Sequence, residues 1–296
     1  MQINFLKHNE INYLKWDETV EKSRNGLVYA LSWFLDVVSP GWEALVSDDY
    51  EYIMPLTVKK KYGVKYIVQP ILCQQLGVFS ASPVNADTVN LLIRKIPYLS
   101  YEINLNAANS TSKGIALPNY LLDLQHGIGF LKDNFSKNTL RNIANSNKKN
   151  LSVDSDVSVE EFLKFYYSEE LNYQKPKEVT TRLLIQTLHQ KQVLTIRGCR
   201  QEDSKLISAV CLIRWQHRII YLLPISSAKG KESSAMFLII DKLIEQYAGS
   251  EIILDFEGSK IEGIARFYKG FGAKNKPYYL IQKLRPKLLI NFMHRK

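Results

Sequence analysis

The sequence has no long hydrophobic run, and this absence excludes a membrane-spanning helix, which needs about 18 consecutive apolar residues. The N-terminal residues MQINFLKHNEINYLKWDE contain no apolar stretch typical of a secretion signal. Cysteine is scarce too: Cys73, Cys199 and Cys211 stand far apart, which excludes a disulfide scaffold and a cysteine-rich zinc site. We therefore expect a cytoplasmic protein, in a reducing compartment, with no integral membrane contact.

Several catalytic motifs are missing as well. The five histidines form no HExxH or HxH pattern, so we expect no metal site. The sequence contains no GxSxG, no Walker-type GxxxxGK[ST] and no GxGxxG, which disfavours serine hydrolases, P-loop nucleotidases and Rossmann dehydrogenases. With 14 glycines and 10 prolines in 296 residues, the chain is neither collagen-like nor dominated by linkers.

What the sequence does contain is an excess of positive charge. It has 39 Lys and Arg residues against 29 Asp and Glu residues, a net charge of +10. This balance favours anionic partners, such as nucleic acid, nucleotide cofactors or phospholipid head groups; solubility alone is the alternative explanation. At roughly 150 residues per domain, the length predicts two domains.

The two halves of the chain follow a similar order of elements. Each runs through a helix, two or three antiparallel strands, a second helix, a strand and an edge strand. The helices are expected over 27–39 and 87–96 in the first half, and over 158–172, 179–190 and 236–247 in the second. A later strand must cross over through a helix, so the order predicts an α/β fold with mixed, mainly antiparallel sheets flanked by helices. We place a first domain at 1–130, a basic linker helix at 131–150 and a second domain at 151–296.

The linker helix carries the first candidate binding residues. Leu140, Ile143 and Ala144 give it one narrow apolar stripe, and basic and asparagine side chains occupy the rest. Lys137 and Arg141 are four residues apart, so they share a face, and we expect them to hold a phosphate of the substrate. The alternative is a solvated linker helix.

A second candidate is the segment SSAKGKESSAM, which leads from a strand into the helix over 236–247. Gly230 permits a tight loop, and Lys229 and Lys231 add positive charge. Unpaired backbone amides near Ser233 and Ser234 would begin the helix, where they can cradle a pyrophosphate or a phosphodiester. The alternative is a plain helix start with Ser233 as its cap.

A third candidate is DFEGSKIEGIARFYKGFGA, residues 255–273. Ser259 and Glu262 fit a capping box, so we expect no chemistry from them. Asp255 and Glu257 flank the end of a strand and are predicted to point to opposite faces. One of them can then face a pocket and take a proton from an amine; the alternative is a carboxylate that binds turn amides.

Four amide side chains in the first half form the last candidate. The period-2 rule places Asn104 and Asn106 of YEINLN on one face, and Gln74 and Gln75 lie near a strand end in CQQLG. We expect this face to line the groove for the acceptor substrate. The alternative is that these amides anchor neighbouring loops, because buried amides need partners.

Long stretches of the sequence resemble a known family. DFEGSKIEGIARFYKGFGA resembles the C-terminal signature of the FemAB/FemX-like acyltransferases, and FSKNTLRNIANSNKKN resembles the serine–lysine–arginine helix between their domains. YALSWFLDVVSPGWEALVSDDYEYIMPL and CQQLGVFS are similar to the N-terminal half of a shorter bacterial branch. The resemblance covers nearly the whole chain and implies two tandem domains, each similar to the GNAT N-acetyltransferase fold.

The resemblance also implies the transfer of an acyl or aminoacyl group to an amine. FemX-like members take the group from aminoacyl-tRNA and place it on a peptidoglycan precursor, whereas GNAT members take it from acyl-CoA. The implied donor is thus acyl-CoA or aminoacyl-tRNA. The implied partners are the anionic donor, tRNA among the alternatives, and an amine acceptor such as a muropeptide precursor.

The family motifs point to particular residues. The FemX-like motif F-K-x-x-F has a lysine directly after its phenylalanine, whereas here Tyr268 follows Phe267 and Lys269 comes one place later. Tyr268 resembles the GNAT tyrosine that protonates the departing thiolate, so Tyr268 or Lys269 is expected to stabilise the leaving group or the oxyanion. SSAKGKESSA matches half of the GNAT phosphate loop, and the first half has ASPVNA in the corresponding place. We therefore expect the second domain to bind the donor and the first to contact the acceptor. The rival function is a non-catalytic GNAT-like module that recognises an anionic ligand.

Overall fold

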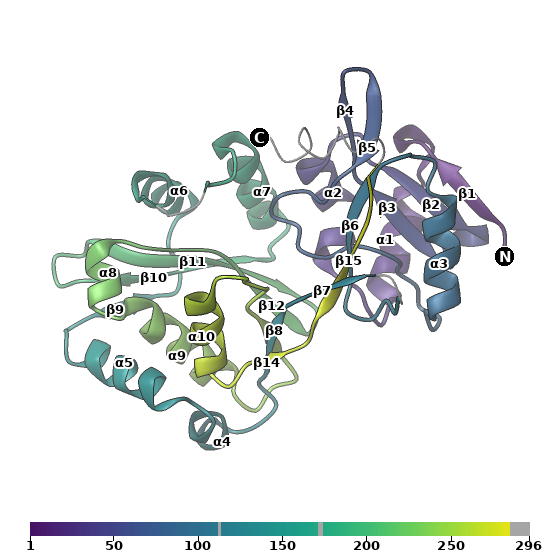
Figure 1. The fold of residues 1–296 in the computed structure, drawn as a ribbon. Helices are drawn as coiled ribbons and strands as arrows, with labels where there is room; N and C mark the ends of the chain where they lie inside the picture. Colours follow the sequence, from purple (N-terminus) through teal and green to yellow (C-terminus); the bar gives the residue numbers. More distant parts are fainter. Residues whose placement is uncertain (112–113, 171–173, 285–296) are drawn as a thin grey trace. The chain divides into compact units, whose positions relative to one another are not determined.

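A computed structural model describes residues 1–111, 114–170 and 174–284, and the chain divides into two compact units (Figure 1). Unit 1 comprises Met1–Leu117 together with the chain from Pro277 onward, and unit 2 comprises Pro118–Lys276. These bounds differ from the expected ones. The segment 131–150 lies inside unit 2 and is not a linker, and residues 277–284 belong to unit 1.

Unit 1 is built on a three-stranded antiparallel sheet, in the order β1-β2-β3, and a five-stranded sheet, in the order β4-β5-β6-β15-β7. The strands are β1 (Ile3–Leu6), β2 (Glu43–Ser47), β3 (Ile53–Leu56), β4 (Val58–Lys61), β5 (Val64–Ile67), β6 (Tyr101–Leu105), β7 (Ile115–Leu117) and β15 (Tyr278–Lys283). The helices are α1 (Tyr13–Lys22), α2 (Ser32–Val38) and α3 (Ala86–Lys95), with 3₁₀ turns at η1 (His8–Glu10), η2 (Val28–Ala30) and η3 (Asp48–Tyr50). The helix expected over 27–39 is broken, because Leu31 has extended backbone angles between η2 and α2.

Unit 2 is built on one seven-stranded sheet, in the order β14-β8-β13-β12-β11-β10-β9. Its strands are β8 (Tyr120–Asp123), β9 (Ser152–Asp154), β10 (Leu194–Arg200), β11 (Leu206–Trp215), β12 (Arg218–Ser226), β13 (Ile253–Asp255) and β14 (Lys274–Asn275). Its helices are α4 (Ile128–Asp133), α5 (Lys137–Asn147), α6 (Val159–Ser168), α7 (Glu178–Gln190), α8 (Ala228–Glu232), α9 (Ala235–Tyr247) and α10 (Glu262–Gly270). The expected helix over 158–172 ends at Ser168, and residues 171–172 lie outside the described part.

The two units exchange their late strands. β8 follows unit 1 in the sequence but pairs with β13 and β14, and β15 follows unit 2 but pairs with β6 and β7 (Figure 1). The sequence-based expectation that each half keeps its own last strand is therefore wrong. A local pattern of alternating apolar residues marks a strand but does not encode which sheet it joins.

Part of the strand order is the same in the two units, since β7-β15-β6-β5 in unit 1 matches β14-β8-β13-β12 in unit 2, which confirms a tandem α/β arrangement with mixed, mainly antiparallel sheets. Each contains one parallel pair, β5 with β6 in unit 1 and β12 with β13 in unit 2. The chain between the paired strands crosses over through α3 in unit 1 and through α8 and α9 in unit 2. In each case an exchanged strand then adds antiparallel to the second strand of that pair.

The core of unit 2 lies between the sheet and helices α5, α9 and α10, while α6 and α7 lie on the other side of the sheet (Figure 1). The apolar periodicity predicts α9 correctly. For α5 the predicted apolar stripe is right only at Ile143. Thr139, Ile143 and Ser146 are the buried residues, whereas Leu140 is 44% exposed and Ala144 is exposed. A narrow face of small and polar residues packs closely here, because α10 approaches α5 at a glycine, Gly270.

No helix in the described ranges is both long enough and apolar enough to cross a membrane. Within the same ranges, no group of three or more His, Cys, Asp or Glu side chains is arranged to hold a metal ion.

Candidate active site

The parallel strands β12 and β13 separate soon after they pair. Their ladder covers only Arg218–Ile220 against Ile253–Asp255, after which β13 ends and β12 continues to Ser226. A bulge bends β12 at this point: its register against β11 shifts, and Leu223 has a positive φ of 53°. Pro224 follows and has no N–H with which to extend a ladder. The divergence leaves an opening at the carboxyl end of the two strands.

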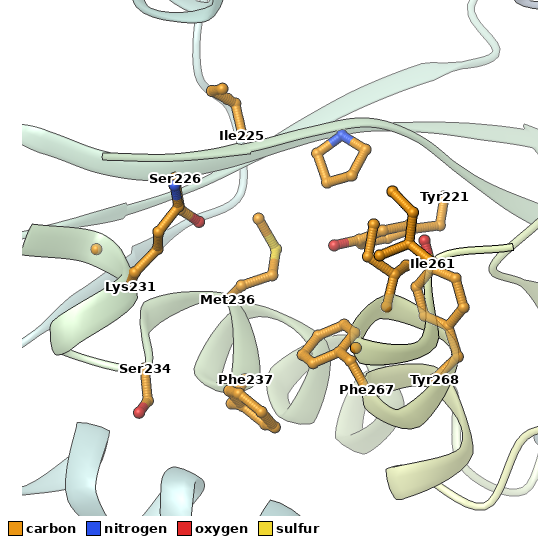
Figure 2. A pocket seen from close by; sticks show the side chains of 14 residues that line it. Tyr221, Ile225, Ser226, Lys231, Ser234, Met236, Phe237, Ile261, Phe267 and Tyr268 are labelled. Carbon is orange, nitrogen blue, oxygen red and sulfur yellow. The ribbon is translucent and has the colours of Figure 1, made fainter. Parts of the chain in front are cut away.

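A cavity of about 490 Å³ occupies this opening, between β12 and the helices α9 and α10 (Figure 2). Tyr221 and Tyr268 lie toward one end of the cavity, and Ser226 and Lys231 lie at the other. The lining between and around them is mostly apolar. The full lining is Tyr221, Pro224, Ile225, Ser226, Gly230, Lys231, Ser234, Met236, Phe237, Ile261, Gly263, Ile264, Phe267 and Tyr268. The site thus combines a phenolic end, an apolar middle and a cationic end.

Tyr268 is held firmly at its end of the cavity. The residue is 6% exposed, and its ring stacks on Phe256 with 4.9 Å between centroids. The rings of Tyr120 and Tyr221 lie 5.8 and 5.9 Å from it. Lys269, the alternative in the sequence, is exposed and outside the lining, with its Nζ 5.6 Å from the Tyr120 ring centroid. Of the two expected residues, the structure brings only Tyr268 into the cavity.

Tyr221 is a second phenol that sequence reasoning missed. It lies in the apolar strand segment RIIYLLPI and was accounted for simply as part of a strand. The sequence does contain a signal for it. Tyr221 is a polar aromatic residue in an otherwise aliphatic strand, three residues before a proline, and the strand leads to the lysine-rich segment. Buried tyrosines keep a polar hydroxyl, which makes such a position worth testing for function.

The expected phosphate-binding residues separate into two groups. Gly230, Lys231 and Ser234 line the cavity, whereas Lys229 and Ser233 line a different, polar cavity of about 470 Å³. Gly230 does not form a loop. It lies in α8, where a Cβ atom would come within 2.1 Å of the backbone oxygen of Ile207. The glycine is therefore required by close packing of α8 on β11.

The backbone amides expected to be free are already bonded. The amides of Gly230, Ser233 and Ser234 donate to Ser227 Oγ, the Lys229 oxygen and the Lys231 oxygen at 3.1, 2.9 and 3.1 Å. The structure also corrects the cap: α9 begins at Ala235, with Ser234 as the N-cap in a left-handed conformation. Its first two helical amides, those of Ala235 and Met236, precede the first bond of the helix start, which the Phe237 amide donates to the Ser234 oxygen at 3.0 Å.

For Asp255 the structure favours the alternative of a carboxylate that binds a turn amide. Asp255 is 1% exposed; Arg218 Nη1 donates to its Oδ2 at 2.5 Å, and the Glu257 amide donates to its Oδ1 at 2.9 Å. Burial raises the pKa of Asp255, and the Arg218 guanidinium opposes this shift. Neither carboxylate is part of the cavity lining. Glu257 is half-buried, and its positive φ of 57° ends the alternation on which the opposite-face expectation rested.

The expected capping box at Ser259 and Glu262 is wrong. The N-cap of α10 is Ile261, and Ser259 Oγ accepts a hydrogen bond from the Ile261 amide at 3.0 Å. Glu262 is the first helical residue, and its carboxylate accepts from Arg266 Nη2 at 2.8 Å. The helix starts two residues later than the motif indicates, so Ile261 is positioned to line the cavity.

Lys137 and Arg141 both lie on α5 of unit 2, away from the cavity lining. Both are exposed, and Arg141 Nη2 donates to Asn138 Oδ1 at 2.8 Å. Their helical spacing is as expected, whereas a role in phosphate binding stays a prediction.

Three of the four amide side chains of unit 1 anchor backbone, and the fourth, Gln74, accepts from Gln75 Nε2 through its Oε1 at 2.6 Å. Asn104 Nδ2 donates to the Gln74 oxygen at 2.9 Å, and Asn106 Nδ2 donates to the Leu76 oxygen at 3.1 Å. Gln75 Oε1 accepts from the Ala107 amide at 3.0 Å. These contacts favour the loop-anchoring alternative, and contact with an acceptor stays a prediction.

Comparisons with known proteins agree on the fold. No protein-family model matches the chain, and no curated protein matches it in sequence. Among solved structures, FemX is similar with a TM-score of 0.68 at 11% identity, over 99% of this chain and 100% of that one. The C-terminal domain of a putative lysylphosphatidylglycerol synthetase from Agrobacterium fabrum gives 0.57 at 9% identity, over 95% and 94%. A tandem GNAT protein from the clavulanic acid biosynthesis pathway gives 0.53 at 10% identity, over 97% and 100%. The chain therefore has the tandem GNAT fold that FemX also has.

Proposed function

We propose that this chain is an N-acyltransferase, which moves an acyl or aminoacyl group from acyl-CoA or aminoacyl-tRNA to an amine. The observation that carries the proposal is the cavity at the divergence of β12 and β13, with two buried phenols toward one end and Lys231 at the other. Fold similarity to FemX and to a tandem GNAT protein supports the same class.

The donor is held along the length of the cavity. Its phosphate-bearing part lies near Lys231 and the start of α9, where helix amides and a cation favour an anion. Its acyl end lies beside Tyr221 and Tyr268. The mostly apolar lining suits a narrow, flexible arm that ends in an acyl chain, which favours acyl-CoA over aminoacyl-tRNA. Lys229 and Ser233 extend the cationic end outward through the neighbouring polar cavity.

The reaction is a direct attack of the amine nitrogen on the carbonyl carbon of the bound thioester. The nitrogen–carbon bond forms while the carbonyl oxygen gains negative charge, which the Tyr221 hydroxyl stabilises. The carbon–sulfur bond then breaks, and the departing thiolate takes the proton of the Tyr268 hydroxyl. The amine proton passes to Glu257 through water, because Asp255 is engaged by Arg218. Tyr268 recovers its proton from solvent.

The acceptor is an amine, and a muropeptide precursor fits the family that the sequence resembles. Lys137 and Arg141 offer two exposed cations on one helix face for a phosphate of that substrate or of tRNA. Lys269 is exposed beside the Tyr120 ring and outside the cavity, so of the two candidates Tyr268 is assigned to the leaving group. Unit 1 supplies acceptor contacts near Gln74, Gln75, Asn104 and Asn106.

The rival is a non-catalytic module that binds an anionic ligand in the same cavity. One observation favours it: Asp255, a candidate base, is buried in an ion pair and stands outside the lining. A binding module needs the cationic end of the cavity but neither phenol.

Acyl-CoA of increasing chain length, with a small panel of primary amines, tests the two proposals. We expect binding by calorimetry and slow release of CoA, and we expect Tyr268→Phe to reduce kcat by about 10²-fold or more with donor Kd unchanged. Tyr62→Phe, at a position that is 82% exposed in unit 1, is the matched control and leaves both unchanged. Binding without turnover, unaffected by Tyr268→Phe, supports the module. Failure to bind any acyl-CoA or aminoacyl-tRNA overturns the acyltransferase proposal and favours the module.

A further inference from the structure

Arg197 is the feature of unit 2 that the proposed reaction does not use and that packing does not explain. It lies on β10 and is only 5% exposed. Its backbone pairs with Val210, and it shares a sheet face with Cys199, so its side chain points toward α9 among core residues. An apolar residue would be the ordinary occupant of this position.

The guanidinium of Arg197 is incompletely satisfied. Its Nη2 donates to Gln246 Oε1, and its Nε is buried with no hydrogen-bond partner. No carboxylate of the described residues forms an ion pair with it. Arg200, three residues further along the same strand, is more exposed but pairs with both Asp154 and Glu161 at 3.1 and 2.7 Å. The most buried arginine described thus has no carboxylate within ion-pair distance.

A buried guanidinium cannot relieve this cost by losing its proton. Burial lowers the pKa of Arg197, but an arginine starts so high that it stays charged at any physiological pH. An uncompensated buried charge is strongly unfavourable, whereas the same charge next to an anion with suitable geometry is not. The position therefore calls for a negative group that the described chain does not provide.

A cavity of about 520 Å³ adjoins Arg197, and its lining suits an anion. The polar lining residues are one further cation, Lys242, and the neutral Asn147, Asn150, Ser155 and Gln246; the apolar ones are Leu151, Val153 and Leu238. There is no carboxylate in this lining. Lys242 itself is ion-paired at the rim, where its Nζ donates to Glu245 Oε2 at 2.8 Å.

The cavity is separate from the proposed donor site. Leu238, Lys242 and Gln246 recur every four residues on α9, so they form one stripe along the helix. Met236 and Phe237, which line the donor cavity, project from the opposite flank. The two linings share no residue.

We propose that this cavity is a binding site for a phosphate group, gripped by Arg197 and Lys242. Two cations and four amide or hydroxyl groups match a dianion with many acceptor positions better than a carboxylate with two oxygens. The unpaired Nε of Arg197 is the donor left for a phosphate oxygen. The group comes either from free inorganic phosphate or from a small phosphate monoester.

Calorimetry and thermal unfolding of the full chain test the site. The probes are inorganic phosphate and glycerol phosphate, and the blank is sodium chloride at matched ionic strength. We expect phosphate to raise Tm above the chloride blank. Arg197→Met should weaken phosphate binding at least tenfold, without lowering Tm in the blank, because it removes an unpaired buried charge. Tighter binding of one probe identifies the source of the group.

Arg214→Gln is the matched control, because Arg214 is an exposed arginine on the neighbouring strand and its loss changes the net charge equally. It should keep the phosphate response. Lys242→Gln changes a half-exposed side chain, so folding is not at risk. It should weaken phosphate binding severalfold. This variant tests the site if Arg197→Met does not fold. The proposal is overturned if phosphate acts no differently from chloride, or if Arg197→Met, or Lys242→Gln in its place, binds phosphate as the unaltered chain does.

Discussion

The strand exchange predicts which unit a core substitution in β15 or β8 destabilises, and the order of the strands in the sequence would predict the opposite. Ile281 lies near the end of the chain on β15, is 5% exposed, and belongs to the core of unit 1. Leu122 lies on β8, is 6% exposed, and belongs to the core of unit 2. Ile281→Ala should therefore destabilise unit 1, and Leu122→Ala should destabilise unit 2.

The expected size follows from the burial of the two side chains. Truncating a buried isoleucine or leucine to alanine costs about 2–5 kcal/mol, through lost apolar contact and the cavity left behind. A loss of about 3 kcal/mol raises the population of opened unit by about 10²-fold. Amides that exchange through that opening should exchange faster by the same factor.

Hydrogen exchange with mass spectrometry resolves the two cases. For Ile281→Ala, faster exchange is expected in peptides of β6 and α3, with α9 and β12 unchanged. For Leu122→Ala, the pattern should be the opposite, and each variant is the control for the other. If Ile281→Ala accelerates exchange in α9 and β12 as much as in β6, the proposed assignment of β15 to the core of unit 1 is refuted.

Three further predictions concern single side chains. Gly230→Ala should lower the unfolding free energy by about 1–3 kcal/mol in urea, because the added Cβ would lie 2.1 Å from a backbone oxygen of β11. Gly129→Ala is the control and should not clash, because no atom lies within 4 Å of its added Cβ. The hydrogen bond from Arg200 lowers the pKa of Glu161. The stabilisation from this carboxylate is therefore complete above pH 4.5 and is lost as the pH falls through the lowered pKa. Glu161→Gln should reduce the dependence of the unfolding free energy on pH in that acid range. Burial raises the pKa of Cys199 to about 11, so a thiol reagent at pH 8 should modify it only after unfolding, and rapid labelling of the folded chain would contradict this.

Much of the fold was predictable because its signals are local. The apolar spacing in α9 and α3 reports one buried face, and the continuous apolar runs of β11 and β12 report buried strands. The duplicated order of elements gave the tandem arrangement. The exchange of β8 and β15 was not predictable, because strand pairing is decided by contacts between distant segments and both strands have ordinary patterns.

The candidate site was predictable only in part. Tyr268 was found through a motif, and the structure places it in the cavity. Gly230 was noted for the wrong reason, since a glycine in a lysine-rich segment suggests a loop, whereas here it allows two backbones to approach. Asp255 was offered as a base because its partner, Arg218, is 37 residues away in sequence. Such a partner cannot be inferred from local spacing.

The strand exchange also bears on how the proposed active site is held together. Tyr120 begins β8, and its amide donates to the Glu257 oxygen at 2.9 Å while its own oxygen accepts from the Phe256 amide at 3.0 Å. These two bonds fix the segment that follows β13, and Phe256 is the ring on which Tyr268 stacks. The Tyr120 ring itself lies 5.8 Å from that of Tyr268. The phenol proposed to protonate the leaving group is thus positioned by a strand from outside the local motif, which explains why a motif alone could name the tyrosine but not its setting.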